Sequence, residues 1–140
     1  MMKINFSIDE FPNDLSESYS LTAYTEGTLK ISVNGEIILD EPDILLIEFC
    51  TSLHKWLNIL DDNQLDFYYA SMDFEEEPIL SFSYIQNLDK YEIKSVWGHS
   101  TAYVTLKEIT NACTIFFNDL KNELLKKYDF KLVIPSTGKE

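Results

Sequence analysis

Two side chains of reactive type, Cys50 and His54, lie four residues apart, a spacing that places both on one side of a helix. A thiol beside an imidazole could act as a nucleophile and its base, or the two could bind a metal. A catalytic pair needs a third group that orients the base, and no motif in the sequence provides one. A zinc site would also need His99 and Cys113, because the chain has two cysteines and two histidines, and their spacings fit no standard zinc motif. We therefore interpret both cysteines as buried, reduced thiols.

The other candidates for catalysis are no more specific. His99 and Ser100 are neighbours in a predicted turn, without the Gly-x-Ser-x-Gly motif of serine hydrolases. The four glycines are too far apart to form a phosphate-binding loop. Paired carboxylates could serve a glycosidase, and the acidic cluster at residues 73–77 could bind calcium or magnesium, but this cluster lacks the interleaved glycine of a calcium loop. The sequence therefore predicts a protein that is not an enzyme and that needs no metal or cofactor.

The charge of the chain excludes further classes of protein. All 11 basic residues are lysines, 24 residues are acidic, and the formal net charge is −13. A nucleic-acid binder needs a basic surface, and an enzyme with a phosphate substrate usually uses arginine, so both classes are disfavoured. The acids are concentrated in the first 77 residues, which carry 17 acids and three lysines, whereas the rest of the chain carries seven acids and eight lysines.

One segment, residues 61–77, combines seven acids with several aromatic residues and contains no lysine. Strand alternation places Asp66 and Tyr68 on one face and Phe67 and Tyr69 on the other. Carboxylates around an exposed tyrosine suit a basic protein partner, because tyrosine is a frequent interface anchor. The alternative is an acidic surface that only keeps the protein soluble. The candidate partner-binding residues are Asp61, Asp62, Asp66, Tyr68, Asp73, Glu75, Glu76 and Glu77.

The elements that must position these residues follow from hydrophobic periodicity and turn signals. Four short strands are predicted first, at residues 4–8, 19–25, 28–33 and 36–39, with Asn34-Gly35 as a hairpin turn. A helix follows, capped by Asp40 or Glu41 with Pro42 in its first turn, and an apolar stripe continues to Leu60. Four more strands are predicted at residues 65–72, 79–86, 91–97 and 102–104.

The last helix has the clearest start signal, a capping box formed by Thr105 and Glu108. Phe130, Leu132 and Ile134 alternate and predict an edge strand, and residues 135–140 are expected to form a flexible tail. The order ββββα-ββββα predicts a single α+β domain over residues 1–140, with one antiparallel sheet of about eight strands and two helices packed on one face.

Targeting signals are absent from the sequence. The N-terminal residues alternate apolar and polar side chains, unlike a signal peptide, and the longest aliphatic run, residues 44–47, is too short to span a membrane. We therefore expect a cytoplasmic protein that does not interact with membranes or nucleic acids.

In its organisation the chain resembles the small, acidic, intracellular immunity proteins of bacterial polymorphic-toxin systems. The resemblance rests on an α+β domain of this length, isolated cysteines, no catalytic motif, and the acidic–aromatic segment at residues 71–78 that leads into residues 79–82. It implies a protein that neutralises a toxin, often a nuclease, by occluding its basic active-site groove. The competing hypothesis is a structural or oligomerisation domain whose acidic surface only solvates it, and self-association remains open in both cases.

Overall fold

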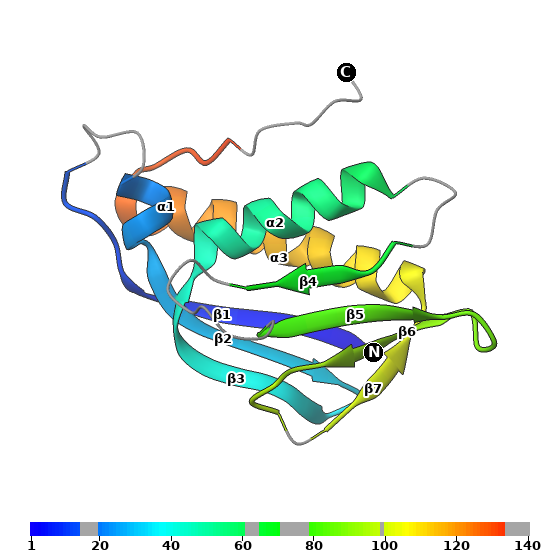
Figure 1. Cartoon of the computed structure of the whole chain (residues 1–140). Helices are drawn as coiled ribbons and strands as arrows, with labels where there is room; N and C mark the ends of the chain where they lie inside the picture. The colour runs from blue at the N-terminus through cyan, green and yellow to red at the C-terminus, as the bar shows by residue number, and fades with distance from the viewer. Residues whose placement is uncertain (15–19, 61–64, 71–78, 99, 134–140) are drawn as a thin grey trace.

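The computed structural model describes residues 1–14, 20–60, 65–70, 79–98 and 100–133, and Figure 1 shows their arrangement. The described residues form an α+β domain in which two helices, α2 (Leu46–Ile59) and α3 (Leu106–Tyr128), lie beside each other over antiparallel strands (Figure 1). The described strands belong to two sheets, one of three strands and one of four.

The N-terminal sheet contains β1 (Met2–Glu10), β2 (Glu26–Val33) and β3 (Glu36–Leu45). Its central strand, β2, places alternate apolar side chains in the core, as the periodicity predicts. The β2–β3 hairpin closes through Asn34 and Gly35, whose φ angles of 51° and 87° are those of a type I′ turn. The predicted hairpin is confirmed.

The second sheet contains β4 (Phe67–Tyr69), β5 (Leu80–Ile85), β6 (Lys90–Lys94) and β7 (Ala102–Val104). Each strand pairs antiparallel with the next strand along the chain. The two sheets approach each other where Gly98 faces β3: a Cβ atom at Gly98 would lie 2.2 Å from the Ile38 carbonyl oxygen. The prediction of one sheet of about eight strands is therefore wrong, and the described residues form seven strands in two sheets.

The helices are α1 (Ser20–Tyr24), α2 (Leu46–Ile59) and α3 (Leu106–Tyr128). Helix α3 begins at the predicted capping box: the Thr105 hydroxyl accepts from the Glu108 N–H at 3.2 Å, and the Glu108 carboxylate accepts from the Thr105 N–H at 3.2 Å. The α3 residues that enter the core are Ile109, Ala112, Cys113, Phe116, Leu120 and Leu124.

One hydrophobic core joins both sheets and both long helices. Trp56 of α2 is at its centre: its ring lies 5.6 Å from Phe67, 5.6 Å from Phe82 and 5.7 Å from Tyr91, measured between ring centroids. The Trp56 indole N–H also donates to the Leu65 carbonyl at 3.0 Å, just before β4. Trp56 thus connects α2 to three strands of the second sheet.

Two boundaries predicted from the sequence are wrong in the first half of the chain. Residues 20–24 form α1 and not a strand, because β1 pairs directly with β2, with Glu10 opposite Glu26, so no strand lies between them in the sheet. Helix α2 begins at Leu46 and not near residue 40, because β3 continues along β2 as far as Leu45. Pro42 is therefore in an edge strand, a position that proline tolerates.

The C-terminal segment differs from the predicted edge strand. Phe130 and Leu132 have no strand conformation, although Leu132 is buried and Phe130 packs against the core. Ile134 and the predicted tail, residues 135–140, lie outside the described residues.

Candidate binding face

Of the eight predicted partner-binding residues, the structure describes Asp66 and Tyr68. The other six, together with His99, lie outside the described residues: Asp61, Asp62, Asp73, Glu75, Glu76 and Glu77. The predicted alternation along β4 is confirmed, because Phe67 and Tyr69 are buried whereas the Tyr68 side chain is 58% exposed.

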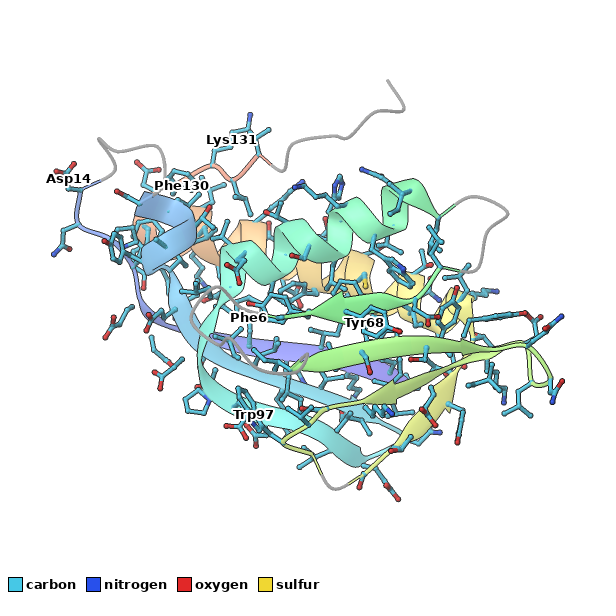
Figure 2. The ribbon with its side chains drawn as sticks, in the orientation of Figure 1. Phe6, Asp14, Tyr68, Trp97, Phe130 and Lys131 are labelled. Atoms are coloured by element: carbon cyan, nitrogen blue, oxygen red, sulfur yellow. The ribbon has the colours of Figure 1, made fainter. Side chains whose placement is uncertain are left out.

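Asp66 and Tyr68 are brought together by a hydrogen bond. The Tyr68 hydroxyl donates to Asp66 Oδ2 at 3.0 Å, and Asp66 Oδ1 accepts from the backbone N–H of Tyr84 at 2.9 Å. The carboxylate therefore holds both the exposed phenol and the neighbouring strand β5. Figure 2 shows Tyr68 on the ribbon of β4. The hydrogen bond to Asp66, followed by the negative charge of Asp66, raises the pKa of Tyr68, so at neutral pH the phenol is protonated and donates.

A second tyrosine–carboxylate pair lies on the same face of the sheet. Tyr103 is 47% exposed, and its hydroxyl donates to Glu92 Oε2 at 3.2 Å. Glu92 is opposite Tyr103 on β7 and opposite Ser83 on β5. The hydrogen bond to Glu92 raises the pKa of Tyr103. Sequence reasoning missed this pair, because its recognition requires the register of β6 against β7.

The charge of this face is uneven. The Lys94 ammonium lies 3.8 Å from Glu92 and partly neutralises it. Asp66 makes no ion pair with any lysine in the described ranges. Its negative charge is therefore not neutralised by an ion pair among the described residues.

The structure describes three of the candidate cysteines and histidines: Cys50, Cys113 and His54. Cys50 and Cys113 are free and buried, which confirms their predicted place in the core. Burial raises the pKa of both thiols to about 12, so neither is a thiolate at neutral pH. His54 Nδ1 forms a hydrogen bond with the side-chain amide nitrogen of Asn58, at 3.2 Å. Among the described residues, no cluster of three or more potential ligands could hold a metal.

A small hollow of about 310 Å³ lies between the β5–β6 hairpin and the start of α3. It is lined by the Tyr84–Asp89 hydrogen bond of 2.8 Å, by Tyr91 and by the first turn of α3. The Tyr91 hydroxyl is buried and has no hydrogen-bond partner within the described parts of the chain. Burial, followed by the charge of nearby carboxylates, raises its pKa, so the phenol stays protonated.

The fold and this face define a small α+β domain of two antiparallel sheets and two long helices, with exposed tyrosines held by carboxylates. A family model, described as a domain of unknown function (DUF7878), matches residues 4–126, and the chain belongs to this family. The match covers the fold from β1 through most of α3. No curated protein and no solved structure matches the chain. Within the described residues, no helix is long and apolar enough to cross a membrane.

Proposed function

We propose that this chain is a non-catalytic protein-binding module whose partner is basic, and that it binds this partner through the outer face of β4–β7 around Tyr68. The observation that carries the proposal is the Tyr68–Asp66 pair: a largely exposed aromatic ring whose hydroxyl is fixed at 3.0 Å by a carboxylate. A ring that is already oriented loses less conformational entropy on binding, which favours its use as an interface anchor.

The chemistry of the pair fits a lysine or arginine of the partner. Asp66 has accepted two hydrogen bonds but has no cationic neighbour among the described residues, so a guanidinium or ammonium group could bind it. The same cation could lie over the Tyr68 ring, where the negative face of the π-system attracts it. The acids of residues 61–77 that flank β4 in the sequence would add long-range attraction.

The finer proposal is that the partner is a toxin and that the chain is an immunity protein. On this hypothesis the acidic face covers a basic active-site groove, such as that of a nuclease, and blocks substrate entry. The net charge of −13 supports this proposal, because a strongly acidic inhibitor associates rapidly with a basic enzyme. The alternative remains a structural or oligomerisation domain.

The test starts with capture of partners from the source cell on immobilised protein. Three baits are compared: the wild type, Tyr68→Ala, and Tyr24→Ala as a matched control on α1, where the tyrosine is similarly exposed at 53%. A basic protein that is recovered by the wild type and the control but lost with Tyr68→Ala supports the proposal. Equal recovery by all three baits would refute it.

The captured partner then allows a kinetic test. Tyr68→Ala should accelerate dissociation and weaken binding by about 2 kcal/mol, as expected for an interface anchor. Asp66→Lys should slow association and reduce its dependence on salt, because the carboxylate attracts the partner at long range. For the toxin hypothesis, co-expression of the wild type should rescue cells from the partner, and Tyr68→Ala should rescue them less. A partner with no toxicity would contradict the finer proposal.

A further inference from the structure

Strand β1 is at an edge of its sheet, since the order is β1-β2-β3. The Asn34 N–H donates to the Met1 carbonyl at 2.9 Å, and Met2 is opposite Val33, so Met1 and Asn34 form a hydrogen-bonded pair. Hydrogen-bonded pairs alternate along an antiparallel ladder. The backbone groups of Lys3 therefore face β2, whereas those of Ile4 and Phe6 face away from it.

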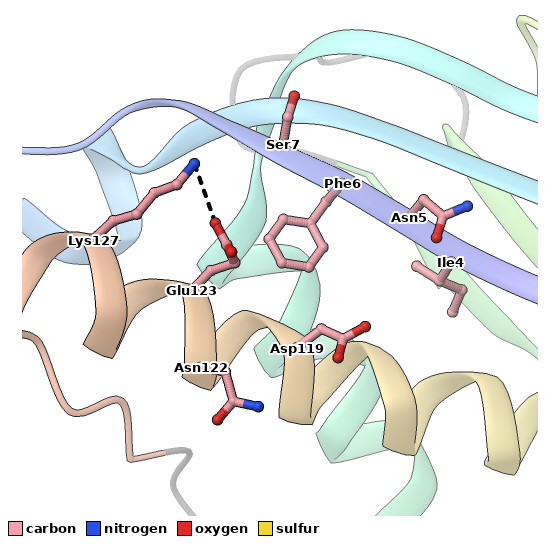
Figure 3. Close-up of a pocket in the computed structure, with 8 residues that line it drawn as sticks. All are labelled: Ile4, Asn5, Phe6, Ser7, Asp119, Asn122, Glu123 and Lys127. Atoms are coloured by element: carbon pink, nitrogen blue, oxygen red, sulfur yellow. Dashed lines mark ion pairs between the residues drawn. The ribbon is translucent and has the colours of Figure 1, made fainter.

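This outward edge borders a groove. A hollow of about 380 Å³ separates Ile4–Ser7 of β1 from the side of α3 that carries Asp119, Asn122 and Glu123 (Figure 3). The Phe6 ring points into the space between strand and helix and packs on Phe116, with ring centroids 5.6 Å apart (Figure 3). No backbone hydrogen bond joins the outward groups of β1 to any other described segment. An unpaired strand edge of this kind is a template for another strand.

The charged side chains of β1 are complementary to those of a second β1 strand that runs antiparallel to it. Lys3 and Asp9 both lie on the solvent face of the strand, near its opposite ends. Lys3 makes no ion pair within the part of the chain that the structure describes. Asp9 accepts hydrogen bonds from the hydroxyls of Ser7 at 3.2 Å and Thr28 at 3.0 Å, and it has no cationic partner among the described residues.

We propose that β1 pairs antiparallel with β1 of a second copy of this chain, in the register that places Phe6 opposite Phe6 of the partner. This register joins the outward-facing backbone groups of Ile4 and Phe6, so it satisfies the alternation derived above. Asp9 is unpaired at a bulge between Ile8 and Glu10, and the hydroxyls of Ser7 and Thr28 hold its carboxylate. In this register Lys3 lies beside Asp9 of the other copy, and two-fold symmetry produces this pair twice. Two sheets of three strands become one continuous sheet of six strands.

The side chains at the centre of this pairing also match. Two partly buried Phe6 rings meet across the two-fold axis, and Asn5 lies opposite Ser7 of the other copy. Shifting the register by two residues would remove Lys3 from Asp9 and Phe6 from the axis, so the charges and the rings select the same register. This surface is distinct from the Tyr68 face, so either proposal can fail without the other.

The test measures self-association by sedimentation equilibrium between about 10 μM and about 1 mM, a range that covers the dissociation constant of a weak dimer. Lys3→Asp replaces two attractive pairs by two like-charge pairs and should raise the dimer dissociation constant at least about tenfold. Asp9→Lys should have a similar effect. The double variant Lys3→Asp/Asp9→Lys reverses both charges and should return to within about threefold of the wild type.

A matched control and a second readout complete the design. Lys55→Asp makes the same charge change on the exposed side of α2 and should leave the dissociation constant unchanged. Amide hydrogen exchange at Ile4, Phe6 and Ile8 should slow as protein concentration rises, because these outward-facing edge amides become paired. A protein that stays monomeric at every concentration would overturn the proposal. It would also be overturned if the single variants left the dimer dissociation constant unchanged, or if the double variant did not restore it. Protection of these amides only when another protein is added would mean that the β1 edge pairs with a segment of that protein. This result would also overturn the proposal.

Discussion

The central position of Trp56 makes a quantitative prediction about stability. Trp56→Phe keeps one aromatic ring in a site that is only 4% exposed but removes the indole N–H and part of the ring system. The lost hydrogen bond to Leu65 is worth about 1 kcal/mol, and about two buried carbon atoms without replacement are worth about 0.8 kcal/mol each. The free energy of unfolding should therefore fall by about 2–3 kcal/mol.

Urea unfolding followed by circular dichroism measures this loss without depending on tryptophan fluorescence. With a slope of about 2 kcal/mol/M, the urea midpoint should fall by roughly 1 M. Trp97→Phe is the matched control, because Trp97 lies in a turn and is 38% exposed, and it should cost less than about 1 kcal/mol. Equal costs for the two variants, or a loss below about 0.5 kcal/mol for Trp56→Phe, would refute the role of Trp56 as the connection between α2 and the second sheet.

Three further predictions concern single sites. Gly98→Ala should destabilise the fold by more than about 1 kcal/mol in thermal unfolding, because its Cβ would lie 2.2 Å from the backbone oxygen of Ile38; a neutral effect would mean that the sheets are not in contact there. Thr105→Ala should cost about 1 kcal/mol through loss of the helix cap, and an unchanged urea midpoint would argue against the capping box. Burial raises the pKa values of Cys50 and Cys113 from 9.0 to about 12 in the folded protein. Above pH 9 the unfolded chain therefore loses the thiol protons first, and the free energy of unfolding should fall as pH rises towards 12, by up to about 1.4 kcal/mol per pH unit for each thiol. The double alanine variant should lose less stability than the wild type over this pH range, and parallel pH profiles would contradict the burial of the thiols.

Part of the candidate binding face could be predicted from the sequence. Strand alternation alone predicts that Tyr68 points outward beside Asp66, and the hydrogen bond between them confirms that they share a face. The bond from Asp66 to the Tyr84 N–H and the pairing of Glu92 with Tyr103 depend on strand register. Register joins residues that are distant in sequence, and no local pattern specifies it.

The sequence by itself determined the features that depend on near neighbours. The Asn34-Gly35 turn follows from residues that adopt positive φ, and the start of α3 follows from a side chain that reaches a backbone N–H three residues away. Only the tertiary structure decided that the strands divide into two sheets, that residues 20–24 are helical, and that β3 continues through Pro42. Pairing with β2 keeps Asp40, Glu41, Ile44 and Leu45 in the sheet, around a bulge at Pro42 and Asp43 where Asp43 has a φ of 61°. The ladder overrides the helix-start signals, because it supplies backbone hydrogen bonds that a helix start there would have to replace.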